Sequence, residues 1–196
     1  MNPNKKINSI EEISDIIRQV SERMDEKDLE GKSIEFRVMQ PEALDSYLVE
    51  ERGASPGTAS LVNGHTLHND GKYTVRIRSM DMYTFLETYF HELGHIATLD
   101  KMLTVKTDRQ QSFTLTETFA YLFQGYAQEK FNELGCGWKY PEAQEKTREL
   151  FLEAALESTN LEPYRRKSLQ MIREMLRIKD VTFEQLYKTL KGQLTR

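Results

Sequence analysis

The spacing of hydrophobic positions changes from helical to strand-like early in the chain. An amphipathic helix is predicted over about residues 9–27, because apolar side chains recur three and four positions apart at Ile10, Ile13, Ile16, Ile17 and Val20. Over residues 34–38 apolar and charged side chains alternate, as in a half-buried strand. Pro41 then suits the first turn of a second helix, which is predicted to reach about Glu51.

Two turn signals follow a predicted loop over residues 53–57. Asn63-Gly64 and Asp70-Gly71 favour hairpin turns, because their residues tolerate positive φ angles. Short runs with strand-like composition lie beside and between these turns and end with Tyr73–Arg78. The pattern predicts a three-stranded antiparallel meander over about residues 58–79.

Every periodic segment after Asp81 has helical spacing. Helices are predicted near residues 81–99, 114–134, 142–158, 163–179 and 182–191, with a polar loop over residues 100–113. Gly135 stands just past a helix end, where a left-handed residue is common. Strands before helices predict an α+β fold, in which a small antiparallel-rich sheet packs on the active-site helices within one domain over residues 1–196.

Composition narrows the classes of function. The 196 residues carry a net charge of −4 with basic side chains dispersed among acidic ones, so we expect no nucleic-acid partner. No segment approaches the roughly 20 apolar residues of a membrane span, and the N-terminus lacks the apolar core of a signal peptide. Cys136 is the only cysteine, which excludes an internal disulfide and a thiolate metal cluster. We therefore expect a soluble, cytoplasmic protein.

The segment His91-Glu92-Leu93-Gly94-His95 is an H-E-x-x-H sequence within a strongly periodic helix. Histidines four apart share one helix face, so both imidazoles can reach one metal ion, and Glu92 beside them can take a proton from a metal-bound water. The chain has only 4 histidines, so this pattern seldom arises by chance at this composition. The alternative is two solvent-exposed histidines with an incidental glutamate.

The same helix separates an apolar face from a polar face. The apolar band lies nearly opposite the two histidines and comprises Met82, Leu86, Tyr89, Leu93 and Ile96. Small polar side chains share the histidine side, namely Thr84, Thr88 and Thr98. We therefore expect protein core beneath the helix and a wet cleft above it.

A catalytic zinc ion needs three protein ligands and an open position. The metzincin spacing is absent, because Thr98 and Lys101 occupy the positions that require Gly and His. Glu117 on the next predicted helix is the candidate third ligand, since the apolar side of that helix faces away from it. It could instead belong to a capping box that starts at Thr114. The rival acids are Asp100, Asp108 and Glu129.

The remaining histidines, His65 and His68, lie on opposite faces of the middle predicted strand and so cannot chelate one ion together. Ordinary surface or hydrogen-bonded histidines are the simpler interpretation. Peptide hydrolysis would also need a group that stabilises the oxyanion. The sequence does not rank the candidates, which are Tyr121, Tyr126, Tyr140, Tyr164, His65 and His68.

Residues 91–95 together with Glu117 resemble the gluzincin branch of the zincin metallopeptidases, which pair H-E-x-x-H with a glutamate from the next helix. The order of hairpin strand, H-E-L-G-H helix and Glu-x-x-Ala-x-x-Phe is similar to ImmA/IrrE-like peptidases and to the small minigluzincins, over about residues 73–130. The resemblance implies a zincin-like fold, one zinc ion, and a peptide substrate bound along an edge strand at Tyr73–Arg78. Tyr121 departs from the acidic residue that often supports the ligand helix.

The sequence thus predicts a zinc-dependent metallopeptidase that hydrolyses peptide bonds through a metal-activated water, with Glu92 as general base. One alternative is a catalytically silent or latent zincin-scaffold protein, whose cleft is covered by helices after residue 142 or by a tail over about residues 180–196. A metal-free helical interaction module is a further alternative.

Overall fold

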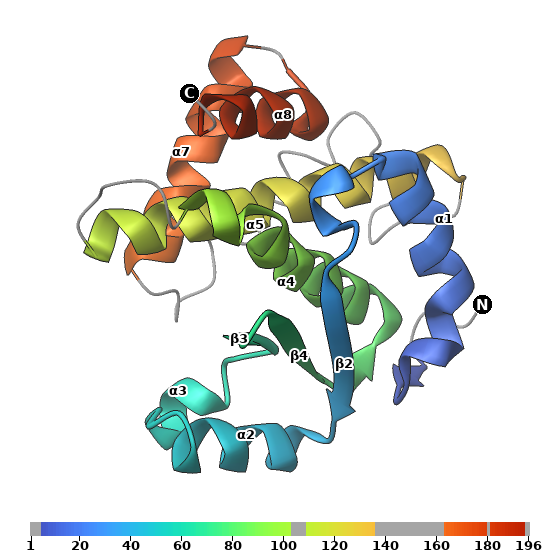
Figure 1. Cartoon of the computed structure of the whole chain (residues 1–196), viewed down its shortest axis with the longest axis vertical. Coiled ribbons are helices and arrows are strands. Elements are labelled where there is room, and N and C mark those ends of the chain that lie inside the picture. Colours follow the sequence, from blue (N-terminus) through green and yellow to red (C-terminus); the bar gives the residue numbers. More distant parts are fainter. Residues whose placement is uncertain (1–4, 103–108, 136–162, 180, 195–196) are drawn as a thin grey trace.

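The computed structural model describes residues 5–102, 109–135, 163–179 and 181–194, and it has an α+β architecture (Figure 1). A three-stranded sheet lies between two layers of helices. One layer holds α2 (Pro41–Glu50) and α3 (Pro56–Ala59), and the other holds α4 (Met82–Met102) and α5 (Arg109–Glu133). Three further helices, α1 (Ser14–Met24), α7 (Pro163–Lys179) and α8 (Phe183–Gln193), pack against α5.

The predicted helices are confirmed where the chain is described. The first comprises a 3₁₀ turn (Ile10–Ile13) followed by α1, and the second corresponds to α2. The predicted loop over residues 100–113 is too long, because α4 continues to Met102 and α5 begins at Arg109. Gly135 has a φ angle of 70°, as expected after a helix end. The helix predicted over residues 142–158 lies outside the described residues.

The sheet is a mixed sheet with the order β2-β4-β3, so the predicted meander is wrong. β3 (Gly64–Asn69) and β4 (Lys72–Arg78) form the hairpin expected at Asp70-Gly71, but β2 (Ser33–Met39) supplies the third strand and pairs with β4 in parallel. The chain just before β3 forms α3 instead of a strand. Pro56 occupies the first turn of α3, and the Ser55 side chain caps it by accepting a hydrogen bond from Thr58 N–H.

This strand order also corrects the predicted substrate strand. Tyr73–Arg78 belongs to β4, which pairs with β2 on one side and β3 on the other. Its backbone groups are therefore used within the sheet and cannot accept an added strand. The edge nearer the candidate site is β3, which contacts α4. An additional short antiparallel pair joins β1 (Lys6–Ile7) to β5 (Met80–Asp81), immediately before α4.

The C-terminal helices pack on α5, away from the β3 edge (Figure 1). On α8 the buried side chains are Phe183, Leu186 and Tyr187. Glu129 of α5 accepts hydrogen bonds from the first two backbone N–H groups of α8, those of Phe183 and Glu184. A latent peptidase of the kind considered above would require the tail to occupy the sheet edge. The described part of the tail does not lie there. No helix within the described ranges is long and apolar enough to cross a membrane.

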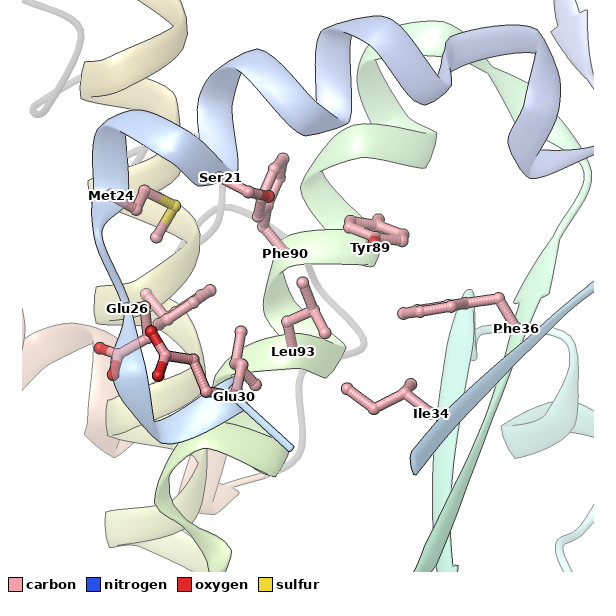
Figure 2. A pocket seen from close by; sticks show the side chains of 11 residues that line it. Ser21, Met24, Glu26, Glu30, Ile34, Phe36, Tyr89, Phe90 and Leu93 are labelled. Carbon is pink, nitrogen blue, oxygen red and sulfur yellow. The ribbon is translucent and has the colours of Figure 1, made fainter. Parts of the chain in front are cut away.

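The main core lies between α4, α5 and the sheet, and every member of the apolar band predicted on α4 is buried. Behind α4, a cavity of about 320 Å³ remains between α1, β2 and α4 (Figure 2). Apolar side chains dominate its lining, including Phe36, which stacks on Tyr89 with ring centroids 4.7 Å apart. This cavity lies on the opposite side of α4 from the histidines, so it is distinct from the candidate metal site.

Candidate metal site

The start of α4 is fixed by the side chain of Asp81. Its carboxylate accepts hydrogen bonds from the Thr84 backbone N–H (3.1 Å) and from the Thr84 hydroxyl (2.7 Å), in the manner of an N-cap. The cap and the buried apolar band together set the rotation of α4. His91 and His95 consequently lie on the opposite face, where their side chains are 12% and 17% exposed.

The two imidazoles are close enough to share one ion. Their ring centroids lie 4.9 Å apart with the planes at 88°. One ligand atom from each of His91, Glu92 and His95 can be chosen so that all three lie within 4.8 Å of one another. Among the described residues this is the group of histidine and acidic side chains that could hold a metal ion.

Glu117 reaches the same point from α5. Its Oε2 atom lies 3.5 Å from His91 Nε2, and its Oε1 atom lies 3.7 Å from His95 Nε2. Ligand atoms around a tetrahedral zinc ion with bonds of about 2.0–2.1 Å lie about 3.3–3.4 Å apart. The carboxylate side chain is only 9% exposed, so it faces the histidines and not bulk water. The two carboxylate–imidazole distances are therefore close to those between ligands of one small cation.

Close packing of α4 on α5 brings these groups together. A Cβ atom added at Gly94 would lie 2.8 Å from Ala120 Cα and 2.8 Å from Phe123 Cβ. Real carbon atoms rest about 3.5–4.0 Å apart, so only a glycine fits at this crossing. Gly94 lies one residue before His95, and Ala120 lies one helical turn after Glu117. The glycine of H-E-L-G-H therefore sets the separation across which the histidines meet Glu117.

The Glu92 side chain is hydrogen-bonded to the neighbouring edge strand, β3. Its Oε2 atom accepts a hydrogen bond from Thr66 Oγ1 at 2.5 Å. A Cβ atom added at Gly64 would lie 2.8 Å from Glu92 Oε1, so the backbone of β3 lies directly against this carboxylate. Glu92 is 5% exposed, which keeps the carboxylate at the boundary between α4 and β3. The sequence analysis assigned Gly64 to a hairpin turn and did not single out Thr66, because the contacts of both residues with Glu92 depend on tertiary structure.

The alternative roles for the acidic residues are resolved by their contacts. Thr114 is not a helix cap, because α5 begins at Arg109 and Thr114 is buried within it. Asp100 pairs with Lys32 at 2.5 Å and is 67% exposed. Glu129 caps α8, as described above. Asp108 lies outside the described residues.

One threonine on the polar side of α4 is buried, although it was predicted to line a wet cleft. Thr98 is fully buried and donates a hydrogen bond from its hydroxyl to Gly94 O at 2.9 Å. Its hydroxyl is therefore satisfied within the helix and does not line a cleft. Thr88 is half-buried and bonds to Thr84 O in the same way, at 2.9 Å.

The candidates for an oxyanion-stabilising group occupy different surroundings. Tyr121 packs its ring edge-on to His91 with centroids 4.7 Å apart. Tyr126 is fully buried and donates to Met24 O, which removes it from consideration. His68 stacks on Tyr73, and His65 lies in the β3 edge strand beside Gly64. Tyr140 and the side chain of Tyr164 lie outside the described residues.

Comparison with known proteins adds no relative. No family model, curated protein or solved structure matches the chain.

Proposed function

We propose that the chain is a zinc-dependent metallopeptidase of the gluzincin type. The observation that carries the proposal is the position of Glu117, whose two oxygen atoms each face one imidazole nitrogen of the H-E-x-x-H pair. Two imidazoles and one carboxylate form the ligand set of many catalytic zinc sites, which keep a fourth position open for water or substrate. His91, His95 and Glu117 would hold the ion.

Glu92 and Glu117 would divide the acidic roles between them. Glu117 presents both oxygens to the histidines, whereas Glu92 has one oxygen bound by Thr66, which suits a base held beside the ligands. A zinc ion bound here supplies a lowered pKa for a coordinated water and polarises a peptide carbonyl. Glu92 would accept a proton from the attacking water at a carboxylate oxygen and deliver it to the leaving amine.

The substrate would be an extended peptide added to β3. This strand lies at the sheet edge and pairs through its other side with β4. A peptide that pairs with β3 passes directly beside Glu92, because Gly64 and Thr66 of this strand both contact that side chain. Backbone hydrogen bonds would therefore place the scissile bond near the metal.

Metal content and turnover test the proposal together. Purified protein should contain about one zinc ion per chain, and Glu92→Gln should retain it while losing peptide hydrolysis. Glu117→Gln should lower zinc affinity about 10-fold or more. Zinc-loaded protein that hydrolyses peptides equally well with Glu92→Gln would contradict the mechanism. Zinc binding without any hydrolysis by the unaltered chain would favour the silent-scaffold alternative.

A further inference from the structure

Three buried polar atoms without hydrogen-bond partners gather on the face of the sheet turned away from α4. They are Tyr47 Oη, His65 Nδ1 and Arg76 Nη1. His65 and Arg76 are directly paired across β3 and β4, and Tyr47 of α2 covers them. The Arg76 guanidinium lies 4.1 Å from the centre of the Tyr47 ring, and the His65 ring lies 5.7 Å from it. Folded proteins pair nearly all buried polar atoms, so these three atoms leave hydrogen bonds for a ligand or a water molecule to complete.

Among the described residues, no acid pairs with Arg76 of this group. Within the described ranges, neither Arg76 nor the nearby Arg52 has a carboxylate oxygen within 4.0 Å. Arg78, two residues along the same face of β4, differs because it pairs with Asp45 at 2.6 Å. Burial, followed by the charges of Arg52, Arg76 and His95, lowers the pKa of His65 to about 4, so this imidazole is neutral near pH 7. The positive charge therefore comes from the two arginines.

The His65 side chain belongs to the strand along which the proposed substrate would bind. Gly64 and Thr66 turn toward Glu92, and His65 between them turns to the opposite face of the same strand. Side chains directly opposite each other on paired strands lie about 4.5–5.5 Å apart at their Cβ atoms. A peptide paired with β3 would thus bring one of its side chains beside His65, close to the residue that meets Glu92.

We propose that Tyr47, His65, Arg76 and Arg52 form an acidic-residue pocket that binds a substrate Asp or Glu side chain near the scissile bond. The inference rests on the proposed peptidase function and adds a substrate class to it. Arg76 donates N–H groups to the carboxylate, Tyr47 adds its hydroxyl, and the more exposed Arg52 strengthens the attraction. The chain would accordingly prefer acidic peptides although its own net charge is −4.

Matched peptides test the preference. A single Glu is moved along a short neutral peptide, each version is paired with its Gln twin, and kcat/KM is measured for both with zinc-loaded enzyme. At one position the unaltered enzyme should prefer Glu by about 10-fold or more, as charge-assisted hydrogen bonds would give. Arg76→Gln should reduce this ratio to near one. Arg18→Gln changes an exposed arginine on α1, away from this face of the sheet, and should leave the ratio intact.

Two further measurements keep the result interpretable. Arg52→Gln alters an exposed side chain that can be replaced without disturbing the fold, and it should lower the Glu preference about 2- to 3-fold. Binding is measured separately by adding zinc-loaded Glu92→Gln protein to fluorescein-labelled Glu and Gln peptides and following fluorescence anisotropy. This variant should bind the peptides without hydrolysing them. If the Glu peptide binds more tightly than its Gln twin but the unaltered chain hydrolyses neither, the result supports the pocket and contradicts the peptidase function. The pocket is refuted if every Glu and Gln pair is cleaved equally, if every pair binds equally, or if neither peptide of a pair binds. Equal cleavage of every pair would still support the peptidase function.

Discussion

Replacing Gly94 with alanine should separate α4 from α5 and loosen the metal site. The new Cβ atom would lie 2.8 Å from Ala120 Cα and 2.8 Å from Phe123 Cβ. Since carbon atoms rest about 3.5–4.0 Å apart, the helices must move apart locally by roughly 0.7 Å or more. Metal–ligand distances tolerate only about 0.2 Å, so Glu117 could no longer meet both histidines without strain. We expect zinc affinity to fall about 10-fold or more.

The stability change combines two opposing contributions. Alanine is favoured over glycine in a helix interior by about 1 kcal/mol, whereas overpacking of a core costs about 1–3 kcal/mol. Gly94→Ala should therefore lower the free energy of unfolding by about 1 kcal/mol. Gly192 in α8 provides the matched control, because nothing lies within 4 Å of a Cβ atom added there. Gly192→Ala should raise the free energy of unfolding by up to about 1 kcal/mol.

Urea unfolding with excess chelator measures the packing effect without metal, and competition with a chromophoric chelator measures zinc affinity. The two alanine variants should differ by about 2 kcal/mol in the free energy of unfolding. Only Gly94→Ala should weaken zinc binding. If the two variants proved equally stable and bound zinc as the unaltered chain does, the close crossing at Gly94 would not be what assembles the site.

Three other predictions concern the base, the acid limit and the metal. Thr66→Val removes the hydroxyl that binds Glu92, so kcat/KM should fall about 10-fold while zinc content, measured by elemental analysis, stays unchanged. Burial raises the pKa of Glu184, but hydrogen bonds from Lys130 and Lys188 outweigh it and bring the pKa to about 2. Because that value lies below the unfolded 4.5, the stabilisation is complete above about pH 4.5 and is lost toward pH 2, so Glu184→Gln should flatten acid unfolding followed by circular dichroism in this window. A chelator should lower the Tm of the purified chain and leave that of Glu117→Gln nearly unchanged, whereas equal shifts would place the metal elsewhere.

The sequence predicted helices and the metal cluster better than it predicted the sheet. Helical periodicity is a local property, so the faces of α4 could be assigned before any contact was known. The H-E-x-x-H spacing works in the same way, since four residues of helix bring His91 and His95 onto one face. Glu117 could be proposed because the neighbouring apolar positions left it on the other side of α5.

The sheet depended on information that no short window contains. β2 joins β4 in parallel across a long stretch of chain, and its own pattern does not name its partner. Asn63-Gly64 has the composition of a hairpin turn, yet Gly64 is needed because β3 approaches Glu92 and Thr88 closely. The hydrogen bond from Thr66 and the cluster around Tyr47 likewise join segments that are distant in sequence. Contacts of this kind follow from packing and not from periodicity.

The alternation of side chains along β3 has a consequence for how this protein can change during evolution. Gly64 and Thr66 face Glu92, while His65 faces the opposite surface. An insertion or deletion of one residue here would exchange the two faces and remove both sets of contacts at once. Sequence divergence in this strand is therefore restricted to replacements at fixed length, and its two surfaces must be inherited as a unit.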